Sequence, residues 1–128
     1  MGYEINEKTF KKYPSSWKEK IKEESYSDKF ILISKKPELW VYLGEHGDHL
    51  LVTKTGAAIY CSCKGFRINL ERKDALGCTH VYSLKISASL GRYRDISYRI
   101  NKDDLHRIIE EILEVDYSYT LRLKLLEK

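Results

Sequence analysis

The sequence predicts an α+β fold, in which an antiparallel β-meander leads into a helix and a C-terminal β-α-β extension follows. Two observations predict this class. Between residues 30 and 60 the apolar runs are short, rich in β-branched and aromatic residues, and separated by turn-forming residues, as in antiparallel hairpins. From residue 81 onwards apolar positions recur at helical spacing, and the last thirty or so residues contain both helical and alternating patterns.

The length and charge of the chain limit both fold and function. The 128 residues are typical of a single domain, which we expect to span residues 1–128. The formal net charge of +4 is mildly basic, so contact with nucleic acid is permitted but not required. No apolar run approaches the ~20 residues that span a bilayer, and we expect a cytoplasmic protein without a membrane partner.

A charged helix is predicted near the N-terminus. Ser16 and Glu19 have the spacing of a capping box, which places the start of the helix there. Trp17 and Ile21 lie four positions apart and can share one face that docks on a core. Two acidic pairs on predicted helices are expected to face solvent: Glu23-Glu24 and Glu110-Glu111.

Four apolar segments are predicted to be strands, with turn residues such as Gly44 and Gly56 between them. They are residues 30–34, 39–43, 50–53 and 57–60. Short turns join the last three, which therefore form an antiparallel meander. The final strand of the meander brings Cys61 and Cys63 to its end, and we expect a loop over residues 64–77 after them.

A helix is predicted from Cys78 to Gly91, because apolar residues recur at helical spacing and glycine is typical of a helix C-cap. The tail over residues 95–126 is predicted as β-α-β and is expected to pack on the rest. Apolar and polar residues alternate over 96–100 and again over 117–125, as in half-buried strands, while Asn101 caps an amphipathic helix between them.

The three cysteines of the chain lie within eighteen positions of one another. Cys61 and Cys63 form a C-x-C pair and, after fourteen residues, Cys78 and His80 form a C-x-H pair. Thiolates and imidazole are ligands that zinc prefers, and four of them close a tetrahedral site. The pattern therefore predicts a structural Zn²⁺ that joins a strand end to a helix start. Buried, unliganded cysteines and a redox C-x-C pair are the alternatives.

This arrangement, C-x-C-x14-C-x-H following strands and opening a helix, resembles the SWIM-type zinc finger. The resemblance covers residues 38–90. SWIM modules are known from chromatin-remodelling ATPases, transposases, kinase-linked proteins and mediators of homologous recombination. The resemblance therefore implies zinc binding and a role in DNA binding or protein interaction, such as that of an accessory factor in recombination or transcription.

Basic residues between and beyond the ligand pairs are the candidate nucleic-acid surface. Phe66 and Tyr93 are interleaved with them and could stack on bases. The candidates are Lys64, Arg67, Arg72, Lys73, Lys85, Arg92 and Arg94. An ordinary charged surface is equally compatible with this composition.

We expect DNA as the partner or, in the alternative, a protein that docks on exposed apolar or tyrosine-rich strands with zinc only structural. His46 and His49 flank a turn, where solvent-exposed histidines are favoured over a second metal site. The chain contains no phosphate-binding loop, nucleophile elbow or metalloprotease motif. Because four protein ligands also leave no open position on the metal, we expect neither enzymatic activity nor a small-molecule substrate.

Overall fold

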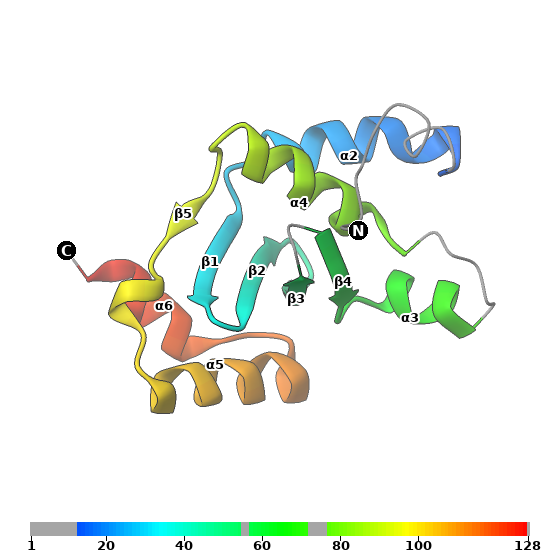
Figure 1. Ribbon diagram of the computed structural model, residues 1–128. Coiled ribbons are helices and arrows are strands. Elements are labelled where there is room, and N and C mark those ends of the chain that lie inside the picture. Colours follow the sequence, from blue (N-terminus) through cyan, green and yellow to red (C-terminus); the bar gives the residue numbers. More distant parts are fainter. Residues whose placement is uncertain (1–12, 55–56, 72–76, 128) are drawn as a thin grey trace.

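A five-stranded sheet lies at the centre of the molecule (Figure 1). The computed structural model describes residues 13–54, 57–71 and 77–127. The strand order is β4-β3-β2-β1-β5; β1 to β4 are antiparallel neighbours, and β5 runs parallel to β1. The bounds are β1 Phe30–Lys35, β2 Glu38–Gly44, β3 Gly47–Lys54, β4 Ala57–Cys61 and β5 Arg94–Asp95. The predicted meander is confirmed, and β1 extends it by one strand.

Helices cover both faces of the sheet, with α2 and α4 on one face and α5 and α6 on the other (Figure 1). The helices are α2 Lys18–Ser25, α3 Lys64–Glu71, α4 Thr79–Ser89, α5 Lys102–Val115 and α6 Tyr119–Leu126, with 3-10 turns η1 Ser15–Trp17 and η2 Ser97–Arg99. The predicted α+β class is confirmed. Among the described residues, no helix combines the length and the apolarity that crossing a bilayer requires.

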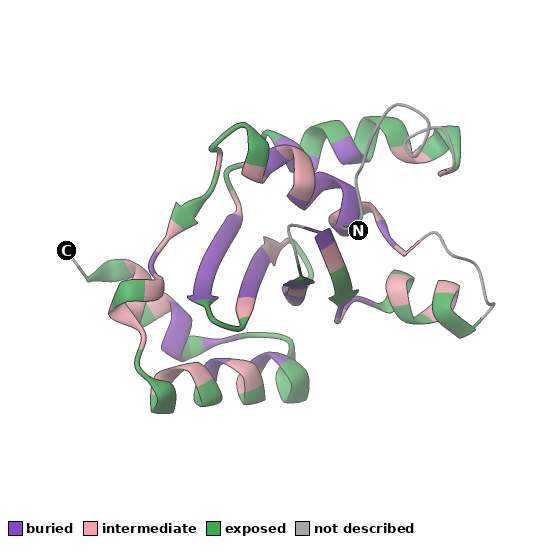
Figure 2. Ribbon diagram, viewed as in Figure 1, coloured by how far each residue is buried: buried purple, intermediate pink, exposed green. Residues whose placement is uncertain are grey.

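The central strands are buried on both faces (Figure 2), which explains why their sequences are apolar almost throughout. Alternate residues of β1, β2 and β3 contribute to two separate cores. The cysteine core consists of Phe30, Leu32, Trp40, Tyr42, Leu51, Cys61, Cys63, Cys78, Val81 and Leu84. The aliphatic core consists of Ile31, Ile33, Leu39, Val41, Leu50, Ile96, Ile108, Ile112 and Leu121.

The N-terminal helix is confirmed as α2, but the predicted capping box does not form. Ser16 already lies inside the 3-10 turn η1, which runs directly into α2. The backbone N–H of Trp17 donates to the Pro14 carbonyl at 3.0 Å, and no side chain caps the start of α2. Ile21 is buried as expected, whereas Trp17 is half-buried with its ring 6.3 Å from that of Tyr82.

The predicted strand over 96–100 is wrong. Pairing with β1 ends at Asp95, and the chain then makes the 3-10 turn η2. The Asp95 Oδ1 atom accepts hydrogen bonds from both the backbone N–H and the hydroxyl of Ser97, at 2.9 and 2.7 Å. Such an aspartate turn competes with continued strand pairing. Ile96 nevertheless reaches the aliphatic core.

The predicted strand over 117–125 is also wrong, because this segment forms α6. Ser118 caps the helix: its hydroxyl oxygen accepts a hydrogen bond from the Leu121 backbone N–H at 3.1 Å. Leu121 and Leu125, four residues apart, pack on the aliphatic core, while Leu123 points to solvent. The alternation in the sequence therefore does not correspond to alternate burial, and the C-terminal extension is not β-α-β.

The segment between the ligand pairs, predicted as a loop, contains the helix α3. Its first turn is fixed by Cys63, whose carbonyl accepts a hydrogen bond from the Arg67 backbone N–H at 3.3 Å. The helix lies beside the end of β4 and extends outward from the sheet (Figure 1). Lys64 and Arg67 of this helix are exposed, whereas the Asn69 side-chain amide donates back to the Gly77 carbonyl at 2.6 Å.

Candidate metal centre

Cys61 and Cys63 lie at the end of β4, where Ser62 holds the chain against β3. The Ser62 backbone N–H donates to the Leu50 carbonyl at 2.9 Å, and the Leu50 backbone N–H donates to the Ser62 hydroxyl oxygen at 2.8 Å. Ser62 is thus hydrogen-bonded through its backbone and its side chain. Because side chains two residues apart in an extended chain point the same way, both thiols turn toward the start of α4.

Cys78 and His80 occupy the start of α4. Cys78 is the N-cap residue, with extended backbone angles of φ −152° and ψ 174°, and its carbonyl accepts from the Val81 backbone N–H at 3.2 Å. Its side chain is buried, while that of His80 is half-buried. The helix start therefore positions the second pair of side chains, as the strand end positions the first.

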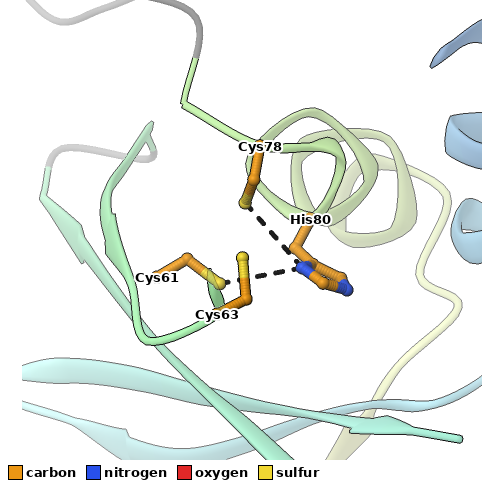
Figure 3. Close-up of side chains that lie close together, drawn as sticks. All are labelled: Cys61, Cys63, Cys78 and His80. Carbon is orange, nitrogen blue, oxygen red and sulfur yellow. Dashed lines mark hydrogen bonds between the residues drawn. The ribbon is translucent and has the colours of Figure 1, made fainter. Parts of the chain in front are cut away.

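The four side chains converge on one point (Figure 3). Their ligand atoms all lie within 4.8 Å of one another, and the His80 Nδ1 atom is 3.8 Å from the Sγ atoms of both Cys61 and Cys78. Zinc–sulfur and zinc–nitrogen bonds of normal length in a tetrahedron would place sulfur and nitrogen about 3.6 Å apart. The cluster therefore has the donor set and nearly the dimensions needed to hold a metal ion.

The three thiols also influence one another's protonation. Hydrogen bonds from Cys61 and Cys78 lower the pKa of the Cys63 thiol. The hydrogen bond to Cys63, together with that to Cys78 and burial, raises the pKa of the Cys61 thiol. One thiolate is thus stabilised at the cost of the others, and several thiolates can coexist here only around a positive ion. The Phe66 backbone N–H, 3.3 Å from the Cys63 Sγ atom, supports negative charge on that sulfur.

The surroundings of His80 include a residue that sequence reasoning missed. Glu24 of α2 was expected to face solvent with Glu23, but only Glu23 does so. The Glu24 carboxylate is buried, and its Oε2 atom lies 3.3 Å from the His80 Nε2 atom. No local pattern could have indicated this contact, because α2 and the start of α4 are far apart in the sequence.

The second acidic pair is divided in the same way: Glu110 is exposed, but Glu111 is half-buried. The Glu111 carboxylate accepts hydrogen bonds from the Ser118 hydroxyl and the Thr120 backbone N–H, at 2.7 and 3.0 Å. It therefore fastens the start of α6 to α5. Ser118 could have been identified in the sequence as a helix N-cap, which would have pointed to this role.

His46 and His49 do not join a second cluster of ligands. His46 is exposed, while the half-buried ring of His49 lies 4.8 Å from the ring of His80. Burial and the neighbouring His80 lower the pKa of His49. Within the described parts of the chain, the converging set of potential metal ligands is Cys61, Cys63, Cys78 and His80.

Two of the candidate nucleic-acid residues, Lys64 and Arg67, lie together and exposed on α3. Lys85 is half-buried on α4. Arg72 and Lys73 follow α3 in the sequence but lie outside the described residues. The basic residues adjacent to the ligand pairs are therefore grouped, as far as the structure describes them, on α3.

Arg92 and Arg94 do not join that group, because the C-terminal end of α4 and β5 lie across the molecule from α3 (Figure 1). Both side chains bind within the protein. The Arg92 Nη2 atom is 2.9 Å from an Asp28 carboxylate oxygen, and the Arg94 Nη2 atom donates to the Leu125 carbonyl at 2.8 Å. The seven predicted residues thus do not form one continuous surface.

No family model, no curated protein and no solved structure matches this chain. What the centre can do chemically therefore has to be argued from its own donor atoms and surroundings.

Proposed function

We propose that Cys61, Cys63, Cys78 and His80 hold one structural Zn²⁺ and that the chain is a SWIM-like module acting as a DNA-binding accessory factor. The observation that carries the proposal is the convergence of four ligand atoms, within 4.8 Å, from a strand end and a helix start. A metal bound there links β4 to α4 and fixes both ends of the segment that contains α3.

Zinc is favoured by the donor set. Three thiolates and one imidazole are typical of structural zinc sites, whereas magnesium and calcium require oxygen ligands. With all four positions taken by protein atoms, the metal has no site for water or substrate. We therefore propose a structural role for the metal and no enzymatic one.

The proposed DNA contact is made by α3. Lys64 and Arg67 are exposed on this helix, and Arg72 and Lys73 follow it in the sequence. Because the ligands immediately before and after the segment are tied to one metal, its basic residues would be presented at a fixed place. Guanidinium and ammonium groups held in this way suit contacts with phosphates, which bind without dependence on base sequence.

The test is a DNA-binding titration at several salt concentrations with the Lys64→Ala/Arg67→Ala double variant. We expect weaker binding and a salt slope smaller by about 2, since each phosphate contact contributes about 0.9. The matched control is Lys102→Ala/Arg107→Ala, which removes two exposed basic residues from α5 on the other face of the sheet. Equal binding by the wild type and both variants would remove DNA contact from the proposal.

A second candidate function, that of a protein-interaction adaptor, is favoured by exposed apolar side chains in the same region. Ile59 on the edge strand β4 is 56% exposed, and Leu70 on α3 is 64% exposed. Apolar residues on an edge strand suit a protein partner better than a phosphate backbone.

The two functions differ in what Leu70→Glu does. If the chain is an adaptor, this variant should lose a co-purifying protein partner, and no DNA binding should be measurable at any salt concentration. Leu113→Glu, at a residue 55% exposed on α5, is the control and should keep the partner. Retention of the partner by Leu70→Glu would contradict the adaptor function at this surface.

A further inference from the structure

Glu24 is a buried acid on a helix whose other charged residues face solvent. Only 2% of its surface is exposed, whereas the neighbouring Lys20, Lys22 and Glu23 are exposed. Placing an ionised carboxylate in a protein interior is unfavourable unless hydrogen bonds and a countercharge replace its water. The position of Glu24 therefore requires partners.

Those partners lie on the first turns of α4, the helix that carries two of the candidate ligands. The Glu24 Oε2 atom accepts from the Thr79 hydroxyl at 3.2 Å and lies 3.3 Å from the His80 Nε2 atom. Its Oε1 atom accepts from the Ser83 hydroxyl at 2.7 Å. Each carboxylate oxygen is thus held, and one of them faces the histidine.

The two nitrogens of His80 face different partners. Its Nδ1 atom lies toward the sulfur atoms of Cys61 and Cys78, each 3.8 Å away, and its Nε2 atom lies toward Glu24. An imidazole that coordinates a metal through one nitrogen carries its proton on the other. A carboxylate that accepts from this second N–H fixes the tautomer and the ring orientation and makes the coordinating nitrogen more basic.

Aromatic packing alone would not select this orientation. The rings of Tyr42 and His49 lie 4.9 and 4.8 Å from the ring of His80. Packing of this kind restricts the plane of the imidazole, but it distinguishes weakly between the two positions related by a half-turn of the ring. The contact with Glu24 does distinguish them, since a carboxylate accepts from N–H far better than from C–H.

We propose that Glu24 is a positioning residue of the metal centre, which orients His80 so that Nδ1 is presented to the metal. This rests on the proposed zinc binding. It enlarges the centre beyond residues 38–90, because α2 becomes part of it. It also gives the buried acid its countercharge: an imidazole bound to a cation donates to Glu24 more strongly than a neutral one.

The first test compares Glu24→Gln with Glu23→Gln, a matched change at the exposed neighbour. Zinc affinity is measured by competition with a chromophoric chelator. We expect Glu24→Gln to weaken zinc binding by about 10–100-fold, as typical for the loss of such a partner, and Glu23→Gln to leave it unchanged. Equal zinc affinity in Glu24→Gln and the wild type would overturn the proposal.

The second test uses the zinc-loaded wild type and therefore does not depend on how any variant folds. In ¹⁵N spectra of the imidazole groups, His80 should show metal-bound Nδ1 and a slowly exchanging proton on Nε2. Metal on Nε2, or an Nε2 proton that exchanges as fast as that of the exposed His106, would overturn the role of Glu24. A wild type that binds no zinc would instead overturn the proposed function, and the role of Glu24 with it.

Discussion

On one face of the sheet α5 and α6 pack through aliphatic side chains, whereas the core on the other face contains three thiols, beside His80, among its apolar side chains. The aliphatic core needs only the removal of apolar surface from water. The cysteine core also contains three thiols beside His80, which the proposed zinc would hold together as ligands. The two faces should therefore respond differently when conditions change, although they share the same strands.

Among the residues that the structure describes, each face also contains one buried acid, and the two acids are held in different ways. Asp48, 1% exposed, accepts from both Nη atoms of Arg122 and from the Ser118 backbone N–H at 2.8 Å. The hydrogen bond to Asp48 raises the pKa of Arg122, so this countercharge is permanent. Glu24 faces a histidine instead, whose positive character comes from the proposed metal. The ion pair between Asp48 and Arg122 therefore does not need a metal, whereas we expect the contact between Glu24 and His80 to strengthen when zinc is bound.

The largest predicted effect is that of removing the metal. Zinc binding by small structural sites contributes about 10 kcal/mol or more to folding. Here the proposed site lies on one face of the sheet, so its loss should affect that face. Treatment with a strong chelator, or Cys63→Ser, should abolish hydrogen-exchange protection in α3 and the first turns of α4. Protection in α5 should persist. Equal loss of protection on both faces, or none on either, would contradict the division of the molecule into two faces.

The next largest effect concerns the ion pair between Asp48 and Arg122. Asp48→Ala leaves the Arg122 guanidinium without its carboxylate and should destabilise the fold by about 3–5 kcal/mol, measured by denaturant unfolding of the zinc-loaded protein. Zinc content should not change. Glu114→Ala, at an exposed acid on α5, is the control and should shift stability by less than about 0.5 kcal/mol. A loss of zinc in Asp48→Ala would show that the faces are coupled.

A comparison of two leucines tests the aliphatic face more finely. Leu121 is fully buried, whereas Leu123, two residues later, is 62% exposed. Leu121→Ala should destabilise by about 2–5 kcal/mol, while Leu123→Ala should be close to neutral, by thermal and denaturant unfolding. Were the segment a strand, both side chains would lie on the same face, and the two substitutions would have similar effects.

This pair of residues also explains where the sequence predicts the fold and where it does not. The strands β1 to β4 are predictable because short apolar runs with turn residues between them have one interpretation. The segment around Leu121 has two possible interpretations, since its alternation favours a strand while Leu121 and Leu125 also have helical spacing. The Ser118 cap and the aliphatic core favour the helix, and the core is not visible in the local sequence.

The residues of the candidate site also differ in whether the sequence alone predicts them. The four ligands are predictable because C-x-C and C-x-H are local patterns with a specific chemistry. Glu24 is not, since its hydrogen-bond partner Thr79 lies 55 positions away and the sequence around Glu24 is that of an ordinary charged helix. The grouping of basic residues likewise depends on topology, which places β5, the strand that begins with Arg94, across the molecule from α3 (Figure 1).

The central claim, that four side chains hold one structural zinc, is tested most directly by counting metal and thiols in the same preparation. Elemental analysis of the native protein should give one zinc per chain, and its three cysteines should resist a thiol reagent until a chelator or a denaturant is added. Cys63→Ser should retain little zinc. A native protein that lacks zinc, keeps its full stability and exposes its thiols to the reagent at once would contradict the claim.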